Sequence, residues 1–234
     1  MRLLTITVLT VFLSISAGVA SAHEFIVVPE KWQSYQVGQE VPVSVFSTHV
    51  FVRSEELEDD GYTELNYQGA KLPLTANRNW LTYDSKVTLQ GNGAAIINGH
   101  RLPMLYQNTR YEKFAKLILP VAGKSNGFDA VQGHRLEIVP MSNPLEAKVG
   151  DEISFRVLLD GKPAAFDTIF ATYSGFSDIP NAWAFSASPV SHGQGKIRIS
   201  ASGLWVVRVT VVLDEKSKDY NAVDLKAVLT FPVK

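Results

Sequence analysis

The sequence predicts an all-β protein, with two β-sandwich, Ig-like parts that follow a cleaved signal peptide. Apolar residues recur in short runs rich in Val, Ile, Phe, Tyr and Leu, which is typical of strands. Gly, Pro, Asn and Asp separate these runs, as turn-forming residues do. The strands predicted on this basis are 25–28, 40–47, 86–89, 94–97, 114–121, 136–140, 152–159, 168–173, 196–200, 205–212 and 227–233.

Two of these segments also indicate how the sheets are covered. Apolar residues nearly alternate along 152–159, and Asp-Gly-Lys-Pro at 160–163 then provides a turn, because Asp-Gly tolerates positive φ and Pro ends ladder pairing. The segment 205–212 is more continuously apolar, which indicates a strand with both faces covered. Two stacked sheets are the simplest architecture that satisfies both patterns.

The first 22 residues are interpreted as a secretory signal peptide. Met1-Arg2 gives a positive start, an apolar run extends from Leu3 to Val19, and Ala20-Ser21-Ala22 supplies an A-x-A cleavage site. An anchor would need roughly 20 unbroken apolar residues. Cleavage after Ala22 makes His23 the first residue of an exported protein without a membrane span. We expect this protein to lie in a bacterial periplasm.

Charge and cysteine content exclude several classes of function. Loss of residues 1–22 removes one basic residue, so that 22 basic and 23 acidic residues become 21 and 23. This balance argues against a nucleic-acid partner. The chain has no cysteine, which excludes disulfides, thiolate metal sites and a cysteine nucleophile. Any metal would have to bind to His, to carboxylates or to the new α-amine.

The glycines of 122–133 predict a boundary between two domains. Gly123-Lys-Ser-Asn-Gly127 and Gly133 interrupt the strand pattern there. The predicted organisation is therefore a signal peptide at 1–22, an N-terminal β domain at 23–132 and a C-terminal Ig-like β-sandwich at 133–234. The acidic stretch 55–60 is either the start of a short helix or a solvated loop.

His23 is the first candidate metal ligand. After cleavage it carries a free α-amine and an imidazole, which together chelate one ion through two nitrogens. A second imidazole would complete a three-nitrogen set that suits late first-row metals, with Cu(II) the tightest binder. The alternative is a frayed terminus without a role. Glu24 is a further acidic candidate, or a solvated charge.

His49 is the candidate for the second imidazole. It follows the apolar strand 40–47 and precedes Val50-Phe51. If Phe46 points inward, alternation places His49 on the opposite face, away from the core. The alternative reading is a hydrogen-bonded surface imidazole.

Other residues offer weaker signals. His100, His134 and His192 lie in turn-like contexts without metal-site spacing, and we expect them to be structural or incidental. Neither G-x-S-x-G nor H-E-x-x-H occurs. Tryptophans and tyrosines can line a carbohydrate groove, although core or edge packing is commoner, and we expect core packing for Trp205. The tryptophans are Trp32, Trp80, Trp183 and Trp205.

Several segments together resemble a family of exported bacterial proteins. The family is known as a domain of unknown function and is linked to nickel or cobalt uptake. It implies a periplasmic accessory protein in which His23 and His49 match the family's two histidines, whereas His134 departs from the pattern. The matching segments are 22–25 (Ala-His-Glu-Phe), 38–41, 48–51, 111–116, 133–140, 143–144, 150–151, 157–163, 195–196, 203–205 and 229–231.

We therefore predict a non-enzymatic periplasmic protein that binds a divalent transition metal through His23 and His49. The resemblance favours Ni(II) or Co(II), and implies an envelope metal-uptake transporter as a possible partner. Coordination preference alone places Cu(II) first. Two other hypotheses remain open, namely a copper histidine-brace oxidoreductase acting on a polysaccharide and a non-catalytic binding module of the cell envelope.

Overall fold

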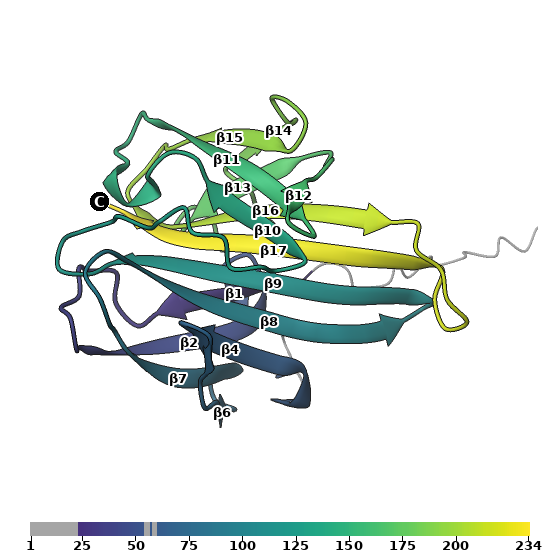
Figure 1. Ribbon diagram of the computed structural model, residues 1–234, viewed down its shortest axis with the longest axis horizontal. Helices are drawn as coiled ribbons and strands as arrows, with labels where there is room; N and C mark the ends of the chain where they lie inside the picture. Colours follow the sequence, from purple (N-terminus) through teal and green to yellow (C-terminus); the bar gives the residue numbers. More distant parts are fainter. Residues whose placement is uncertain (1–22, 54–56, 58–59) are drawn as a thin grey trace, which may run out of the picture.

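The computed structural model describes residues 23–53, 57 and 60–234, and nearly all of their regular structure is β-strand. The all-β prediction is confirmed. Three sheets lie in layers (Figure 1). The predicted signal peptide and residues 54–56 and 58–59 of the acidic stretch lie outside the described residues. That stretch ends in a 3-10 turn, η2 (Asp60–Tyr62).

The middle layer, called here the central sheet, has eight strands in the order β14-β13-β16-β17-β9-β8-β4-β5. Their bounds are β14 (Phe185–Ala187), β13 (Ile169–Tyr173), β16 (Gly203–Leu213), β17 (Ala222–Val233), β9 (Thr109–Pro120), β8 (Ala94–Tyr106), β4 (Thr63–Tyr67) and β5 (Ala70–Lys71).

An N-terminal sheet and a C-terminal sheet cover the two faces of the central sheet. The N-terminal sheet contains β1 (Glu24–Pro29), β2 (Glu40–His49), β7 (Thr82–Thr88), β6 (Thr75–Asn77) and β3 (Val52–Arg53). The C-terminal sheet contains β10 (Leu136–Pro140), β11 (Glu152–Leu159), β12 (Lys162–Pro163) and β15 (Gln194–Arg198). The short 3-10 turn η3 (Pro144–Glu146) links β10 to β11.

Strands from both predicted domains share the central sheet. β17 pairs with β9 in parallel, from Ala222 opposite Thr109 to Thr230 opposite Leu117. All the other strand pairs described are antiparallel. The parallel pair crosses the expected boundary between 132 and 133, and the division into two domains stays a prediction.

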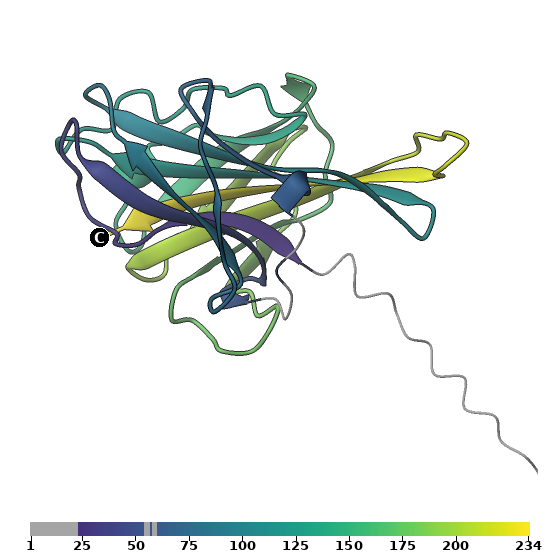
Figure 2. The ribbon, with the colours of Figure 1, turned by 90° about the horizontal axis from the view of Figure 1, so that it is seen from below.

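Four strands of the central sheet, β8, β9, β16 and β17, are longer than the sequence predicted. β8 and β9 form a hairpin whose two turn residues, Gln107 and Asn108, have φ of 46° and 60°, as a type I′ turn requires. The ends of these strands and of β16 and β17 project beyond the rest of the molecule (Figure 2). His100 lies within β8. The expectation that it occupies a turn was therefore wrong.

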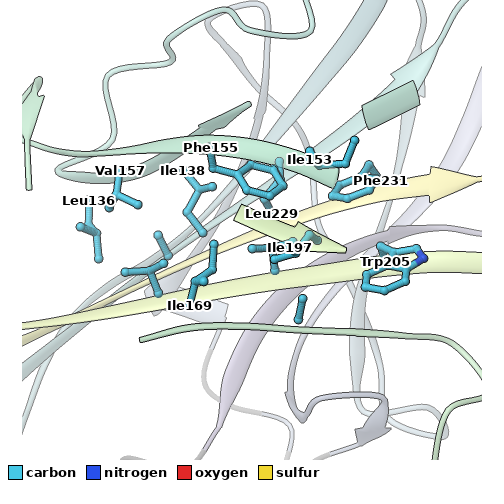
Figure 3. Packing of buried hydrophobic residues seen from close by; sticks show 14 of the residues in the cluster. Leu136, Ile138, Ile153, Phe155, Val157, Ile169, Ile197, Trp205, Leu229 and Phe231 are labelled. Carbon is cyan, nitrogen blue, oxygen red and sulfur yellow. The ribbon is translucent and has the colours of Figure 1, made fainter. Parts of the chain in front are cut away.

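The largest apolar cluster fills the space between the central sheet and the C-terminal sheet. Phe155, Trp205 and Phe231 are fully buried there (Figure 3). The indole nitrogen of Trp205 donates a hydrogen bond to the Ala201 carbonyl at 2.9 Å. The prediction that Trp205 packs in the core is confirmed.

A second cluster lies between the opposite face of the central sheet and the N-terminal sheet. Phe25 and Val27 of β1 enter it. Ile26 points to the other side, where it packs with Phe46 and with Val206 of β16. β1 is therefore covered on both faces, so that its first residues are held tightly. No helix in the described ranges is long and apolar enough to cross a membrane.

Candidate metal centre

The pairing of β1 with β2 brings the two predicted ligands together. In this antiparallel register Glu24 lies opposite Thr48, so one further step places His23 opposite His49. Directly opposed residues point to the same face of a sheet. The two imidazole rings meet edge to face, with centroids 4.3 Å apart and an interplanar angle of 62°. The sequence therefore identified two residues that the fold makes neighbours.

His49 lies on the face of β2 opposite Phe46, as alternation suggested. Val43 and Val45 enter the cluster beneath the N-terminal sheet, and His49 continues their face two positions beyond Ser47. Phe46 lies on the other face, in the smaller cluster with Ile26. His49 itself is half-buried at the end of the strand, and its position away from the core stays a prediction.

One imidazole nitrogen of His49 lacks a hydrogen-bond partner in the described part of the chain. This nitrogen is Nδ1, and it is buried. A buried polar atom without a partner costs free energy, and a metal ion can satisfy an imidazole nitrogen. The alternative reading, a hydrogen-bonded surface imidazole, does not account for this buried nitrogen.

Glu24 is neither a solvated charge nor free to bind an ion. Its side chain is fully buried, and Oε1 accepts a hydrogen bond from Arg208 Nη1 at 3.0 Å. Lys226 Nζ lies 3.9 Å from the same oxygen. Oε2 accepts from the backbone N–H of Val50 at 3.3 Å. Both oxygens of Glu24 are thus engaged within the protein, and both expectations for this residue were wrong.

These contacts fix the backbone on both sides of the histidine pair. Val50 directly follows His49 and has a φ of 68°, a strained conformation for a β-branched residue. Glu24 holds the N–H of Val50, while Lys226 Nζ donates to the backbone carbonyl of His23 at 3.1 Å. Burial lowers the pKa of Lys226 to about 8, against the raising effect of Glu24. The network positions both ligands.

The donor set fits a transition metal only if the α-amine takes part. Within residues 23–53, 57 and 60–234, no group of three or more His, Cys, Asp or Glu side chains gathers as a metal site would. His23 and His49 supply two imidazoles, and a mature terminus at His23 would add a third nitrogen. Metal ions bind imidazole nitrogen at about 2.0–2.1 Å, and rings this close can share one ion.

The remaining histidines have other surroundings than the pair formed by His23 and His49. His100 Nε2 lies 2.8 Å from Glu112 Oε1, and its ring stacks on Phe114. His134 stacks on the same phenyl ring at 5.3 Å between centroids. His192 lies in a turn beside β15, as expected. His192 thus has the turn context that the sequence suggested, whereas His100 lies in a strand.

Sequence reasoning missed Arg208 and Lys226, the two cations that hold Glu24. Both lie in strands that read as apolar runs, and an isolated basic residue in such a run was the only signal available. Arg208 is further fixed by stacking, because its guanidinium lies 4.4 Å from the Phe170 ring centroid and 5.0 Å from that of Trp183. A buried cation in an apolar strand requires a buried partner, which here is Glu24.

A protein-family model described as a domain of unknown function, DUF4198, matches residues 20–212. The chain belongs to the DUF4198 family. The match includes His23, Glu24, His49 and Arg208, whereas Lys226 lies beyond its last residue. No curated protein sequence matches the chain.

Solved structures similar to this DUF4198 protein share little sequence with it. The D0-D1 domain of intimin is 14% identical, with 90% of this chain and 98% of that chain covered and a TM-score of 0.26. A putative membrane anchored protein from Corynebacterium diphtheriae is 11% identical, with 86% of this chain and 58% of that chain covered and a TM-score of 0.29. A marsupial T cell receptor is 8% identical, with 89% and 97% covered and a TM-score of 0.29.

Proposed function

We propose that this DUF4198 protein is an exported, non-enzymatic accessory protein that binds one divalent transition metal. The ligands are the α-amine and imidazole of His23 and the imidazole of His49. In this proposal the protein works in the periplasm and presents nickel or cobalt to an envelope uptake transporter. The nickel or cobalt role rests on the family resemblance.

One observation supports the metal site above all. The rings of His23 and His49 lie 4.3 Å apart, and Nδ1 of His49 is buried without a hydrogen-bond partner in the described chain. Histidines that serve only packing have their nitrogens paired within the protein or with water. A metal ion would satisfy the unpaired nitrogen and explain why two imidazoles meet.

The donor set also predicts how binding depends on conditions. Unperturbed α-amines have a pKa of about 7.7–8.0 and imidazoles of about 6.5, and both must be deprotonated to bind a metal. Binding at pH 7 should therefore release protons and weaken at lower pH. Among divalent ions, nitrogen donors favour Cu(II) over Ni(II), Co(II) and Zn(II).

Calorimetric titration of the secreted, mass-verified protein tests the proposal. Ni(II), Co(II), Cu(II) and Zn(II) are titrated into the protein and into His49→Ala, with His192→Ala as the matched control. We expect one ion per chain, an affinity loss of about 100-fold or more in His49→Ala, and unchanged binding in His192→Ala. Equal binding by His49→Ala, or none by the unmodified protein, would overturn the proposal.

A copper oxidoreductase is the second candidate, and the all-nitrogen donor set is the observation that favours it. Such an enzyme requires copper that cycles between two oxidation states. The copper-loaded protein is therefore mixed with ascorbate, and oxygen consumption is compared with that of the same mixture containing His49→Ala. Consumption above the variant's rate would favour the oxidoreductase. Equal rates would leave the accessory protein as the better account.

A further inference from the structure

A groove lies on the side of the N-terminal sheet that faces away from the central sheet. Its volume is about 710 Å³, within the range of about 300–1,000 Å³ typical of small-molecule sites. Ser44 of β2 and Asp84 of β7 lie opposite each other in its floor. Phe46, Arg53 and Trp80 line it as well. The metal proposal does not use any of these side chains.

An exposed indole stands at this groove in a fixed position. Trp80 is 62% exposed, and the guanidinium of Arg53 lies 4.7 Å from its ring centroid. Arg53 Nη1 also donates a hydrogen bond to the Trp80 carbonyl at 2.9 Å. An aromatic ring held this way offers a flat apolar surface without losing conformational entropy on binding.

A carboxylate in the groove is held charged by three neutral donors. Asp84 Oδ1 accepts hydrogen bonds from Ser44 Oγ at 2.8 Å and Thr82 Oγ1 at 2.7 Å, and Oδ2 accepts from Asn77 Nδ2 at 2.8 Å. Burial by itself raises the pKa of Asp84, but these bonds and the charge of Arg53 outweigh it and lower the pKa. Asn77 Oδ1 in turn accepts from the backbone N–H of Trp80 at 3.3 Å, so the backbone that carries the indole is linked to the carboxylate through Asn77.

The charges that line the groove are balanced. Glu30 and Asp84 contribute two carboxylates, and Arg53 and Lys86 contribute two cations. An anionic ligand would approach the carboxylates, and a cationic ligand would approach the basic side chains. A neutral ligand rich in hydroxyl groups is not repelled by charges of either sign. Each of its hydroxyl groups can donate a hydrogen bond to a carboxylate and accept one from a cation.

We propose that this groove binds the neutral sugar rings of an oligosaccharide. The apolar C–H face of one ring packs on Trp80, and its hydroxyl groups exchange hydrogen bonds with Asp84 and Arg53. The chain thereby carries a saccharide site separate from the histidine pair.

Titration of the metal-free, full-length secreted protein with three defined sugars tests this site. The probes are cellotetraose, maltotetraose and the anionic tetragalacturonate, followed by tryptophan fluorescence and calorimetry. At least one neutral sugar should bind with a Kd below about 1 mM. Trp80→Ala should weaken that binding by about tenfold or more. Trp32→Ala, which removes another exposed indole that lies outside the groove, should change it less than about twofold.

The results of this titration either support or overturn the proposed saccharide site. Binding of cellotetraose alone or of maltotetraose alone, lost in Trp80→Ala, supports the proposal and identifies the linkage. No neutral sugar bound at 10 mM (about 10 Kd or more on the expectation above), equal binding by Trp80→Ala, or tighter binding of tetragalacturonate overturns it. His49→Ala should bind the sugar unchanged, which separates this result from the test of the metal site.

Discussion

Two pairs of histidines lie on opposite faces of the central sheet, and the two pairs differ in what surrounds their rings. His100 and His134 stack on the two sides of Phe114, and His100 is bonded to Glu112. His23 and His49 contact each other, and one nitrogen of His49 has no partner in the described chain. The first pair has a structural explanation within the fold, whereas the second is the pair for which we propose a metal ion.

The two pairs also differ in how their surroundings are built. Around His134, burial lowers the pKa of the imidazole to about 4, so the ring stays neutral and packs as an aromatic. Around His23 and His49 the protein instead buries Glu24, Arg208 and Lys226, at a cost in desolvation. This buried network holds the backbone beside both ligands. Buried charges of this kind are also found in structural ion-pair networks, and the proposed metal centre is one explanation for their position beside His49.

The largest effect on stability is expected from removing the carboxylate beside the histidine pair. Glu24→Ala leaves Arg208 and Lys226 without their buried partner, and such a break costs about 3–5 kcal/mol. Urea unfolding followed by circular dichroism measures the loss. Glu40→Ala is the matched control, because Glu40 pairs with Lys86 on the surface at 2.8 Å and exposed ion pairs contribute little to stability. Equal losses in the two variants would contradict the assigned role of Glu24.

A pH-dependent loss of stability is expected from the other histidine pair. The pKa of His134 is about 4 in the folded protein and about 6.5 when unfolded. The unfolded chain therefore binds more protons between these values, and stability falls as the pH drops from 6.5 towards 4. The loss is at most about 3 kcal/mol, since one pKa unit corresponds to about 1.36 kcal/mol.

Urea unfolding of the unmodified protein and of His134→Asn at pH 7, 5.5 and 4 measures this loss. Asparagine cannot titrate, so the difference in unfolding free energy between the two proteins should narrow as the pH falls. A difference that stays constant over this range would show that His134 does not titrate as described.

The smallest effect, on metal affinity, is expected from replacing His100, and it tests the difference between the two histidine pairs. His100→Ala removes the hydrogen bond to Glu112, whose side chain is 8% exposed, and an unsatisfied buried acceptor costs about 1–3 kcal/mol. Metal affinity should change less than about twofold, because no ligand is touched. The same calorimetric titration as above measures it. A large loss of metal affinity would show that His100 belongs to the metal site. The two histidine pairs would then not differ in the way described above.

The sequence predicted the strands best where the chain is most regular. β10 and β11 were predicted residue for residue, because their apolar runs end at Pro140 and at the Asp160-Gly161 turn, where φ is 49° and 76°. β4, β5, β6 and β14 were missed, since they are short and partly polar. Such segments form through pairing with a neighbouring strand, which local composition does not reveal.

For the candidate site, the sequence supplied the residue types but not their contacts. The proximity of His23 and His49 follows from the register of β1 on β2, and register depends on the whole sandwich. Glu24 read as a surface charge because its partners, Arg208 and Lys226, are distant in sequence. The resemblance to known proteins suggested the histidine pair, whereas the network that holds it required the fold.

The most direct test of the histidine pair is a metal titration of the secreted protein beside a variant with one alanine inserted before His23. The insertion keeps every side chain but moves the free α-amine away from the imidazole of His23. We expect the unmodified protein to bind one Cu(II) or Ni(II) ion per chain and the variant to bind about 100-fold more weakly or not at all. Equal affinity in the two proteins would contradict the amine-and-imidazole site.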